Sequence, residues 1–290
     1  MGKMSFVLGG GGARGALQVG ALQALLEADI RPDLLVGTSV GAINAAFIAM
    51  RGFSVQGLEE LRAAWQAASQ ADLLPSNYLW LTVRTLFGRI REYPFYRLKD
   101  FYIAQGISPD LKFKHLDGPE LFMVAADMNR QDCFLYGEDP EHSVLEGLLA
   151  STALPPWSRP LNLEGRYLMD GGVVSNLPVE PALSRGATQI IALDLADPRV
   201  PMVDNNTVGV FLNKLMGTVI QRQTNLELAL ADAQGVQVER ILLQSKEPIP
   251  IYDFKFTLDL IQQGYEITRK SIVHLESSRR PWWRRLLWTN

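Results

Sequence analysis

Several features that would assign the chain to a particular class of protein are missing from the sequence. Cys133 is its only cysteine, so no disulfide can form within the chain, and we expect a reducing compartment. No apolar run reaches the roughly 18 residues that a membrane-spanning helix needs, and the residues after Met1 do not form the apolar region of a signal peptide. We therefore expect a cytoplasmic protein without a spanning helix.

A strong charge and grouped metal ligands are missing as well. The net charge is −3, from 28 lysines and arginines against 31 aspartates and glutamates, so we expect no nucleic-acid partner. The chain has three histidines, and it contains neither an H-E-x-x-H motif nor a group of cysteines and histidines. We therefore expect neither a metal nor an organic cofactor. With 290 residues, 47% of them hydrophobic, the chain can bury a full core.

What is present centres on Ser39. The apolar run at residues 34–36 predicts a buried strand, and the alanine-rich stretch at 42–50 predicts a helix. A strand, G-x-S-x-G and a helix in that order describe a nucleophile elbow, in which the glycines remove Cβ atoms that would collide and the helix N-terminus favours an oxyanion. We predict that Ser39 is a nucleophile; the alternative is a tight turn with a serine cap. The motif consists of Gly37, Thr38, Ser39, Val40 and Gly41.

A glycine-rich loop lies between a predicted strand at residues 5–8 and a predicted helix at 16–28. Gly10 to Gly15 matches the G-x-G-x-x-G of dinucleotide-binding folds, but the next strand ends in Gly37-Thr38-Ser39 and not in the acidic residue that would bind a ribose. Consecutive glycines let several N–H groups converge on one anion. We interpret the loop as an oxyanion hole beside the elbow. A nucleotide-binding protein and a flexible turn without a ligand are the alternatives.

A serine nucleophile also needs a base. His115 and His142 lie in charged loops and His274 lies off the apolar face of a predicted helix, so we expect all three at the surface. His274 is the candidate for a Ser-His triad of the α/β-hydrolase type, but in that fold the serine comes later in the chain. Asp170 instead ends a predicted strand at 166–169 and precedes two glycines.

A buried Asp170 would be a workable base for Ser39. A carboxylate with an ordinary pKa near 3.9 is a poor base for an alcohol. Burial next to the serine hydroxyl would raise its pKa and its basicity. We predict a Ser39–Asp170 dyad, with an Asx-turn at Asp170 as the alternative.

The rest of the chain alternates between predicted helices and strands. Helices are predicted at residues 55–71, 143–151, 208–233 and 257–275, strands at 121–126, 133–136, 189–193 and 238–243, and a polar loop at 200–206.

Two segments combine aromatic and cationic residues. Residues 73–102 suit a lid at a lipid–water interface, or an ordinary packed helical insertion. Residues 279–290 contain four arginines, three tryptophans and no acid, which suits an anionic membrane surface, or a tail folded onto the body.

Three motifs occur in a fixed order: GGGARG at Gly10 to Gly15, GTSVG at Gly37 to Gly41, and DGG at Asp170 to Gly172. Together with Ala150 to Trp157 they resemble the patatin-like phospholipase family, in particular its bacterial members. The resemblance covers roughly residues 5–194. Family members often have Asp-Gly-Ala where this chain has Asp170, Gly171 and Gly172, and both third residues are small.

The resemblance implies a three-layer α/β/α sandwich with a mostly parallel central sheet, a helical insertion and a helical C-terminal region. It implies Ser39 as nucleophile and Asp170 as general base. The oxyanion hole would be formed by N–H groups of Gly10, Gly11 and Gly12, with Ala13, Arg14 and Gly15 in the same loop.

The implied activity is hydrolysis of acyl esters in lipids through an acyl-enzyme. An acyltransferase would share the same dyad, and a non-enzymatic membrane-surface scaffold is a further alternative. We expect one hydrolase domain at residues 5–278, with an aromatic insertion at 72–107 and a basic tail at 279–290. The expected partners are a lipid or acyl ester and an anionic membrane surface, contacted peripherally through 73–102 and 279–290.

Overall fold

A central sheet organises the computed structural model, which describes residues 2–71, 73, 96–154, 158–196 and 208–277. Within these residues the strand order is β5-β6-β3-β2-β1-β7-β8, and β4 pairs with β3. The run from β3 to β8 is parallel, whereas β4, β5 and β6 are antiparallel. The strands are β1 (Met4–Leu8), β2 (Leu34–Thr38), β3 (Glu120–Asp127), β4 (Asp132–Tyr136), β5 (Leu161–Leu163), β6 (Arg166–Asp170), β7 (Gln189–Ala196) and β8 (Gln237–Gln244).

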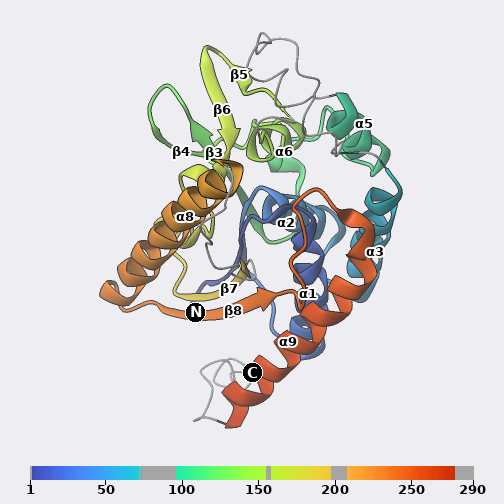
Figure 1. Ribbon diagram of the computed structural model, residues 1–290, viewed down its shortest axis with the longest axis vertical. Helices are drawn as coiled ribbons and strands as arrows, with labels where there is room; N and C mark the ends of the chain where they lie inside the picture. Colours follow the sequence, from blue (N-terminus) through green and yellow to red (C-terminus); the bar gives the residue numbers. More distant parts are fainter. Residues whose placement is uncertain (1, 72, 74–95, 155–157, 197–207, 278–290) are drawn as a thin grey trace.

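Helices cover both faces of this sheet. Figure 1 shows α8 on one side and α1, α2, α3 and α9 on the other. The described helices are α1 (Ala16–Glu27), α2 (Val40–Arg51), α3 (Val55–Gln70), α5 (Tyr96–Ala104), α6 (Val144–Ser151), α7 (Val179–Ser184), α8 (Val208–Ala233) and α9 (Thr257–Ser277), with short 3₁₀ turns at Gly12–Gly15, Phe113–His115, Gly171–Val173 and Phe254–Phe256. The predicted three-layer α/β/α sandwich with a mostly parallel sheet is confirmed.

The apolar strands supply two cores, one on each face. In β1, Phe6 and Leu8 join the core under α1 and α2, while Val7 points to the opposite core, which Leu177 and Val179 share. Successive side chains of a strand alternate between faces, so a continuous apolar run such as β1 fits only a sheet that is covered on both sides.

Strand register brings Ser39 and Asp170 to the same edge of the sheet. Thr38, the last residue of β2, pairs with Val124 of β3, and Asp170, the last residue of β6, pairs with the next residue, Ala125. Ser39 and Asp170 therefore lie on either side of β3 at matching height. The loop after β1 lies at the same edge of the sheet, because β1 runs parallel to β2.

Candidate active site

Ser39 occupies a strained turn between β2 and α2. Its backbone has φ 55° and ψ −124°, a left-handed conformation that costs a non-glycine residue about 1–3 kcal/mol. A Cβ atom at position 37 would lie 2.5 Å from the carbonyl oxygen of Gly41, and one at position 41 would lie 2.1 Å from that of Leu8. Only glycine fits at both positions, as expected for a nucleophile elbow.

The C-terminal end of α6 fixes the two reactive residues relative to each other. Ser151, which is fully buried, accepts a hydrogen bond at Oγ from the backbone N–H of Ser39 at 2.9 Å. Two residues later, the carbonyl oxygen of Ala153 accepts the backbone N–H of Asp170 at 3.1 Å. One short segment therefore holds both the elbow and the end of β6.

Asp170 is buried, with 5% of its surface exposed, and points at Ser39. Its carboxylate accepts the backbone N–H of Gly172 at 2.8 Å and faces the Ser39 hydroxyl. Burial raises the pKa of Asp170 from 3.8 to about 6, against the opposing effect of the Ser39 hydroxyl and the Gly172 N–H. The carboxylate is therefore ionised at neutral pH and more basic than an exposed aspartate.

The glycine loop lies directly against Ser39. A Cβ atom on Gly10 would come within 3.2 Å of the Cβ of Ser39. The structure corrects one expectation, because the N–H of Gly10 donates to the carbonyl oxygen of Asn176 at 3.0 Å and cannot serve as a free oxyanion donor. Among the described residues, the N–H groups of Gly11 and Gly12 have no hydrogen-bond acceptor.

Neighbouring side chains set the direction of those two N–H groups. The carbonyl oxygen of Gly10 accepts Asn176 Nδ2 at 3.5 Å, and that of Gly11 accepts Arg14 Nε at 3.2 Å. In a trans peptide the N–H points opposite to the C=O of the same unit. Each bonded carbonyl therefore turns the N–H of the same peptide unit, that of Gly11 or Gly12, away from the side chain that binds it.

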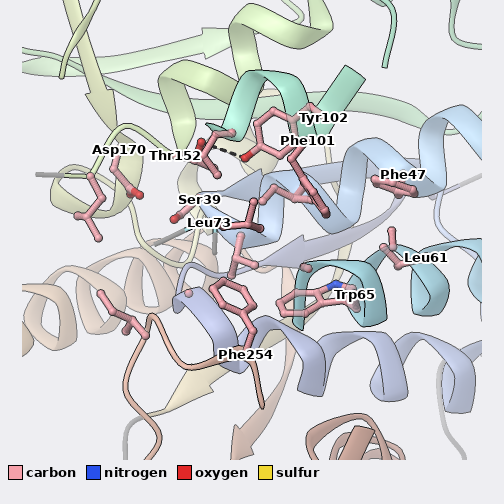
Figure 2. A pocket seen from close by; sticks show the side chains of 18 residues that line it. Ser39, Phe47, Leu61, Trp65, Leu73, Phe101, Tyr102, Thr152, Asp170 and Phe254 are labelled. Carbon is pink, nitrogen blue, oxygen red and sulfur yellow. Dashed lines mark hydrogen bonds between the residues drawn. The ribbon is translucent and has the colours of Figure 1, made fainter. Parts of the chain in front are cut away.

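An apolar pocket opens from Ser39 and Asp170. In Figure 2, Phe47 and Leu61 lie on the side away from Ser39, while Tyr102 and Phe101 of α5 lie above the pocket and Phe254 below it. The lining residues are Gly12, Ser39, Val40, Ile43, Phe47, Leu61, Ala64, Trp65, Ala68, Leu73, Leu98, Phe101, Tyr102, Thr152, Leu154, Asp170, Ile251 and Phe254. Such a lining suits a hydrocarbon chain that reaches the serine with its carbonyl end.

Polar side chains near the pocket are satisfied internally. Trp65 Nε1 donates to Asn44 Oδ1 at 2.8 Å, and Asn44 Nδ2 donates to Gln18 Oε1 at 2.9 Å. Thr152 Oγ1 donates to Leu148 O at 2.7 Å, so its 3.2 Å contact with the Tyr102 hydroxyl has Tyr102 as donor. These bonds leave Ser39 and Asp170 as the reactive groups on an otherwise apolar wall.

The structure describes the surroundings of two of the three histidines, and it leaves most of the two aromatic segments undescribed. The described part of the pocket lining contains no histidine. His115 is exposed, whereas His142 is half-buried against the rings of Phe134 and Tyr136, which corrects the surface placement expected for it. The described residues do not include the side chain of His274. They also leave out residues 74–95, 200–206 and 279–290.

Sequence reasoning missed the residues that position the dyad. Ser151 lies inside the Ala150–Trp157 segment that the family resemblance singled out, so a signal for it existed. Tyr102 ends the aromatic segment 73–102, so a signal existed for it too, whereas Asn176 lies in a segment with no motif and is revealed by its contact with Gly10.

The model of the patatin-like phospholipase family matches residues 6–183, which is more than half of the chain. The chain belongs to the patatin-like phospholipase family. The family match spans the glycine loop, the elbow and the Asp170 turn described above.

Two curated relatives of this patatin-like chain are mammalian and one is bacterial. Patatin-like phospholipase domain-containing protein 7 of Mus musculus is 30% identical over 66% of this chain and 13% of its own length, and protein 6 of Homo sapiens gives the same three values. An uncharacterised NTE family protein of Mycobacterium tuberculosis is 28% identical over 68% of this chain and 31% of its own length. The aligned part is thus less than a third of each relative.

Solved structures with a similar chain trace include one bacterial and one human protein. VipD from Legionella pneumophila matches with a TM-score of 0.49 and 15% identity, covering 94% of this chain and 67% of VipD. Human GIVD cytosolic phospholipase A2, in complex with methyl gamma-linolenyl fluorophosphonate, matches with a TM-score of 0.49 and 13% identity, covering 94% of this chain and 58% of its own.

The described residues contain neither a membrane-spanning helix nor a cluster of metal ligands. None of the described helices is both long and apolar enough to cross a bilayer. No group of three or more His, Cys, Asp or Glu side chains in the described ranges is arranged to hold a metal ion.

Proposed function

We propose that this patatin-like chain is a serine lipid acyl hydrolase, of the phospholipase, lysophospholipase or esterase type, that works through a Ser39–Asp170 dyad. The observation that supports this most is the placement of the Ser39 hydroxyl beside the buried carboxylate of Asp170, with both residues lining one apolar pocket. Membership in the family supports a lipid substrate.

In the proposed mechanism Asp170 takes the hydroxyl proton as Ser39 Oγ attacks the acyl carbonyl carbon. The N–H groups of Gly11 and Gly12 stabilise the oxyanion, and the loss of one such donor typically costs about 10²–10³ in rate. The tetrahedral intermediate collapses to an acyl-enzyme, and the head-group alcohol leaves with the proton from Asp170. Water, deprotonated by Asp170, then attacks the ester and releases the fatty acid and free Ser39.

Labelling with a fluorophosphonate probe tests the dyad. We expect the wild-type chain to react, Ser39→Ala not to react, and Asp170→Asn to react about 10²–10⁴ times more slowly. His142→Ala and His274→Ala serve as controls and should react at the wild-type rate. Full labelling of Asp170→Asn together with loss of labelling in His274→Ala would replace the dyad by a Ser-His triad.

Product analysis separates hydrolysis from acyl transfer. With an acyl ester as sole substrate, we expect release of the free acid, and an added alcohol should divert only part of the acyl group. A chain that consumes the ester only when the added alcohol is present would be an acyltransferase instead.

The proposed membrane contact through residues 279–290 has its own test. Removing these residues takes away four arginines and three tryptophans and should weaken binding to anionic vesicles, most at low salt where charges are least screened. Equal binding of the full and the shortened chain would assign the tail no role at the membrane. The same proposal holds for residues 73–102.

A further inference from the structure

Exposed apolar side chains of the described residues are concentrated on α8. Six of the fifteen large apolar side chains that are exposed there belong to this one helix: Phe211, Leu215, Met216, Val219, Leu226 and Leu230. Phe211, Leu215 and Val219 follow each other at four-residue spacing, and Leu226 and Leu230 continue the row seven and eleven residues later. Residues at these spacings share one face of a helix, so they form a single stripe, which we call the α8 stripe.

The next two four-residue steps of this row, Gln223 and Glu227, hold the loop that carries the catalytic candidate Asp170. Gln223 Nε2 donates to the carbonyl oxygens of Val173 and Val174. Glu227 accepts Ser175 Oγ at 2.6 Å, and it is buried. The helix is therefore fixed to the residues directly after Asp170 by side chains that adjoin the stripe, and the stripe runs beside that turn.

The apolar surface extends from the stripe toward the active site. Val173 belongs to the turn after Asp170, and 37% of its surface is exposed although it is apolar. Its carbonyl oxygen is the acceptor for Gln223, so the backbone of this exposed residue contacts α8. Figure 1 shows α8 running from the neighbourhood of β6 toward the start of β8.

The charges along α8 have one sign where the stripe lies. Between Val208 and Leu226 the sequence has Lys214 and Arg222 and no aspartate or glutamate. Glu227 is turned inward to Ser175, and Asp232 lies in the last turn. A stripe of large apolar residues flanked by cations has the composition of helices that lie flat in the interface of a bilayer.

We propose that the α8 stripe docks on the surface of an anionic lipid bilayer and places the Asp170 turn at that surface. This inference rests on the proposed function, since a hydrolase of membrane lipids must meet its substrate at a bilayer. A second copy of the chain is the less suitable occupant. Two stripes packed face to face would set the positive charge of Arg222 on both copies against one another, and no aspartate or glutamate lies between Val208 and Leu226.

Vesicle co-sedimentation of the full chain tests this surface. All proteins contain Ser39→Ala, so that no lipid is consumed, and the vesicles are phosphatidylcholine with and without phosphatidylglycerol. The test variant combines Leu215→Ser, Val219→Ser and Leu226→Ser. The matched control combines Val55→Ser, Leu242→Ser and Val273→Ser, which removes apolar side chains of similar or greater exposure from other elements. We expect the test variant to bind about tenfold or more weakly and the control to stay within about twofold of Ser39→Ala.

A charge variant tests the choice of lipid. Lys214→Gln combined with Arg222→Gln should remove most of the preference for vesicles that contain phosphatidylglycerol, while binding to pure phosphatidylcholine changes less. Unchanged binding of the triple serine variant would overturn the proposal. So would a dimer in sedimentation equilibrium that the triple serine variant converts to a monomer, because a second copy would then cover the stripe.

Hydrolysis of a short, water-soluble ester, measured with Ser39 intact, separates this inference from the proposed function. The triple serine variant should hydrolyse the soluble ester within about twofold of wild type, since none of its substitutions touches the pocket. Joint loss of vesicle binding and soluble-ester hydrolysis would mean a disrupted fold and would overturn the proposed role of the stripe. Vesicle binding through the stripe by a chain that hydrolyses no ester would overturn the proposed function and leave the docking surface standing.

Discussion

At the scale of single residues, Asp170 shows how burial prepares a carboxylate for chemistry. An exposed aspartate is ionised but too weakly basic to deprotonate an alcohol. Desolvation raises the pKa of Asp170 to about 6, and the N–H of Gly172 and the hydroxyl of Ser39 keep the ionised form available at neutral pH. The burial that makes Asp170 more basic also lowers the stability of the folded protein at neutral pH.

The cost to stability gives a prediction with a definite sign. The pKa of Asp170 is raised on folding from 3.8 to about 6, so the folded state favours the protonated form. The contribution of this carboxyl group to the free energy of unfolding is most favourable below pH 3.8, where the group is protonated in both states. This contribution is lost as the pH rises through about 6. We predict that Asp170→Asn, which stays neutral, raises the free energy of unfolding at pH 7.5 by about 2–3 kcal/mol relative to wild type.

Denaturant unfolding of wild type and Asp170→Asn at several pH values measures this difference. The gain should shrink toward zero as the pH falls from 7 to 4. A variant that is less stable than wild type at pH 7.5 would show that the ionised carboxylate is stabilising and that burial does not dominate its pKa.

Ser151 is a second residue with a specific prediction. Ser151→Ala leaves the N–H of Ser39 buried without its acceptor, which costs about 1–3 kcal/mol and releases the strained turn. We predict that phosphonylation of Ser39 slows about tenfold. Ser143→Ala, at the N-cap of the same helix, removes a hydroxyl that accepts the N–H of Glu146 and should lower stability by about 1 kcal/mol while leaving the phosphonylation rate unchanged. Equal slowing in both variants would mean that α6 stability, and not the bond to Ser39, sets the rate.

At the scale of elements, the turn after β6 leaves different amounts of space for a side chain at Gly171 and Gly172. A Cβ on Gly171 would lie 2.4 Å from the backbone oxygen of Val124, whereas one on Gly172 would meet side-chain oxygens of Asn176 and Asp170 at 3.0 and 3.1 Å. We predict that Gly171→Ala destabilises the fold by about 3 kcal/mol, and that Gly172→Ala costs less than about 1 kcal/mol, as thermal unfolding would show. Similar losses in both would mean that the turn is packed more tightly around Gly172 than these distances indicate.

Helix α3 supplies the end of the pocket that lies away from Ser39. Leu61 lines the pocket, whereas Leu58, one turn earlier and also buried, does not. Truncating either to alanine should cost about 2–5 kcal/mol. Only Leu61→Ala should shift the preferred acyl chain of a soluble ester series to longer chains, because it opens space at the pocket end. An unchanged preference would place the acyl chain elsewhere.

Local sequence patterns were enough for most elements and for the elbow. The apolar runs of β1, β2 and β7 and the helical periodicity of α1, α3 and α9 predicted elements close to those in the structure. The three residues of β5 and the six of α7 are too few to show a period, and both were missed. The helix predicted at residues 208–233 lies outside the part of the chain that carries the family motifs. It is α8, with the same bounds.

The geometry of the site depends on contacts that no local pattern contains. Asp170 meets Ser39 because β6 and β2 pair with neighbouring residues of β3, a register that is set by the whole sheet. The N–H of Gly10 is occupied because Asn176, which is distant in sequence, lies beside it. A run of glycines predicts an anion site but cannot tell which of its N–H groups is free.

At the scale of the whole molecule, the candidate chemistry and the proposed docking surface occupy the same end of the sandwich. The loop after β1, the elbow after β2 and the turn after β6 meet across β3, and α8 is bonded to the last of them. Ligands of open α/β sheets bind at the carboxyl ends of parallel strands, where the loops can vary while the sheet stays rigid. The core can thus support a strained serine and a desolvated carboxylate at its edge.

Intact mass spectrometry of the full chain, acid-quenched during turnover of an acyl ester, tests the central claim most directly. The proposed mechanism predicts a species heavier by one acyl group in place of one hydrogen, and peptide mapping should assign that group to Ser39. Asp170→Asn should form this species far more slowly. Steady turnover without any covalent species, or an acyl group on another residue, would contradict the claim that Ser39 is esterified during catalysis.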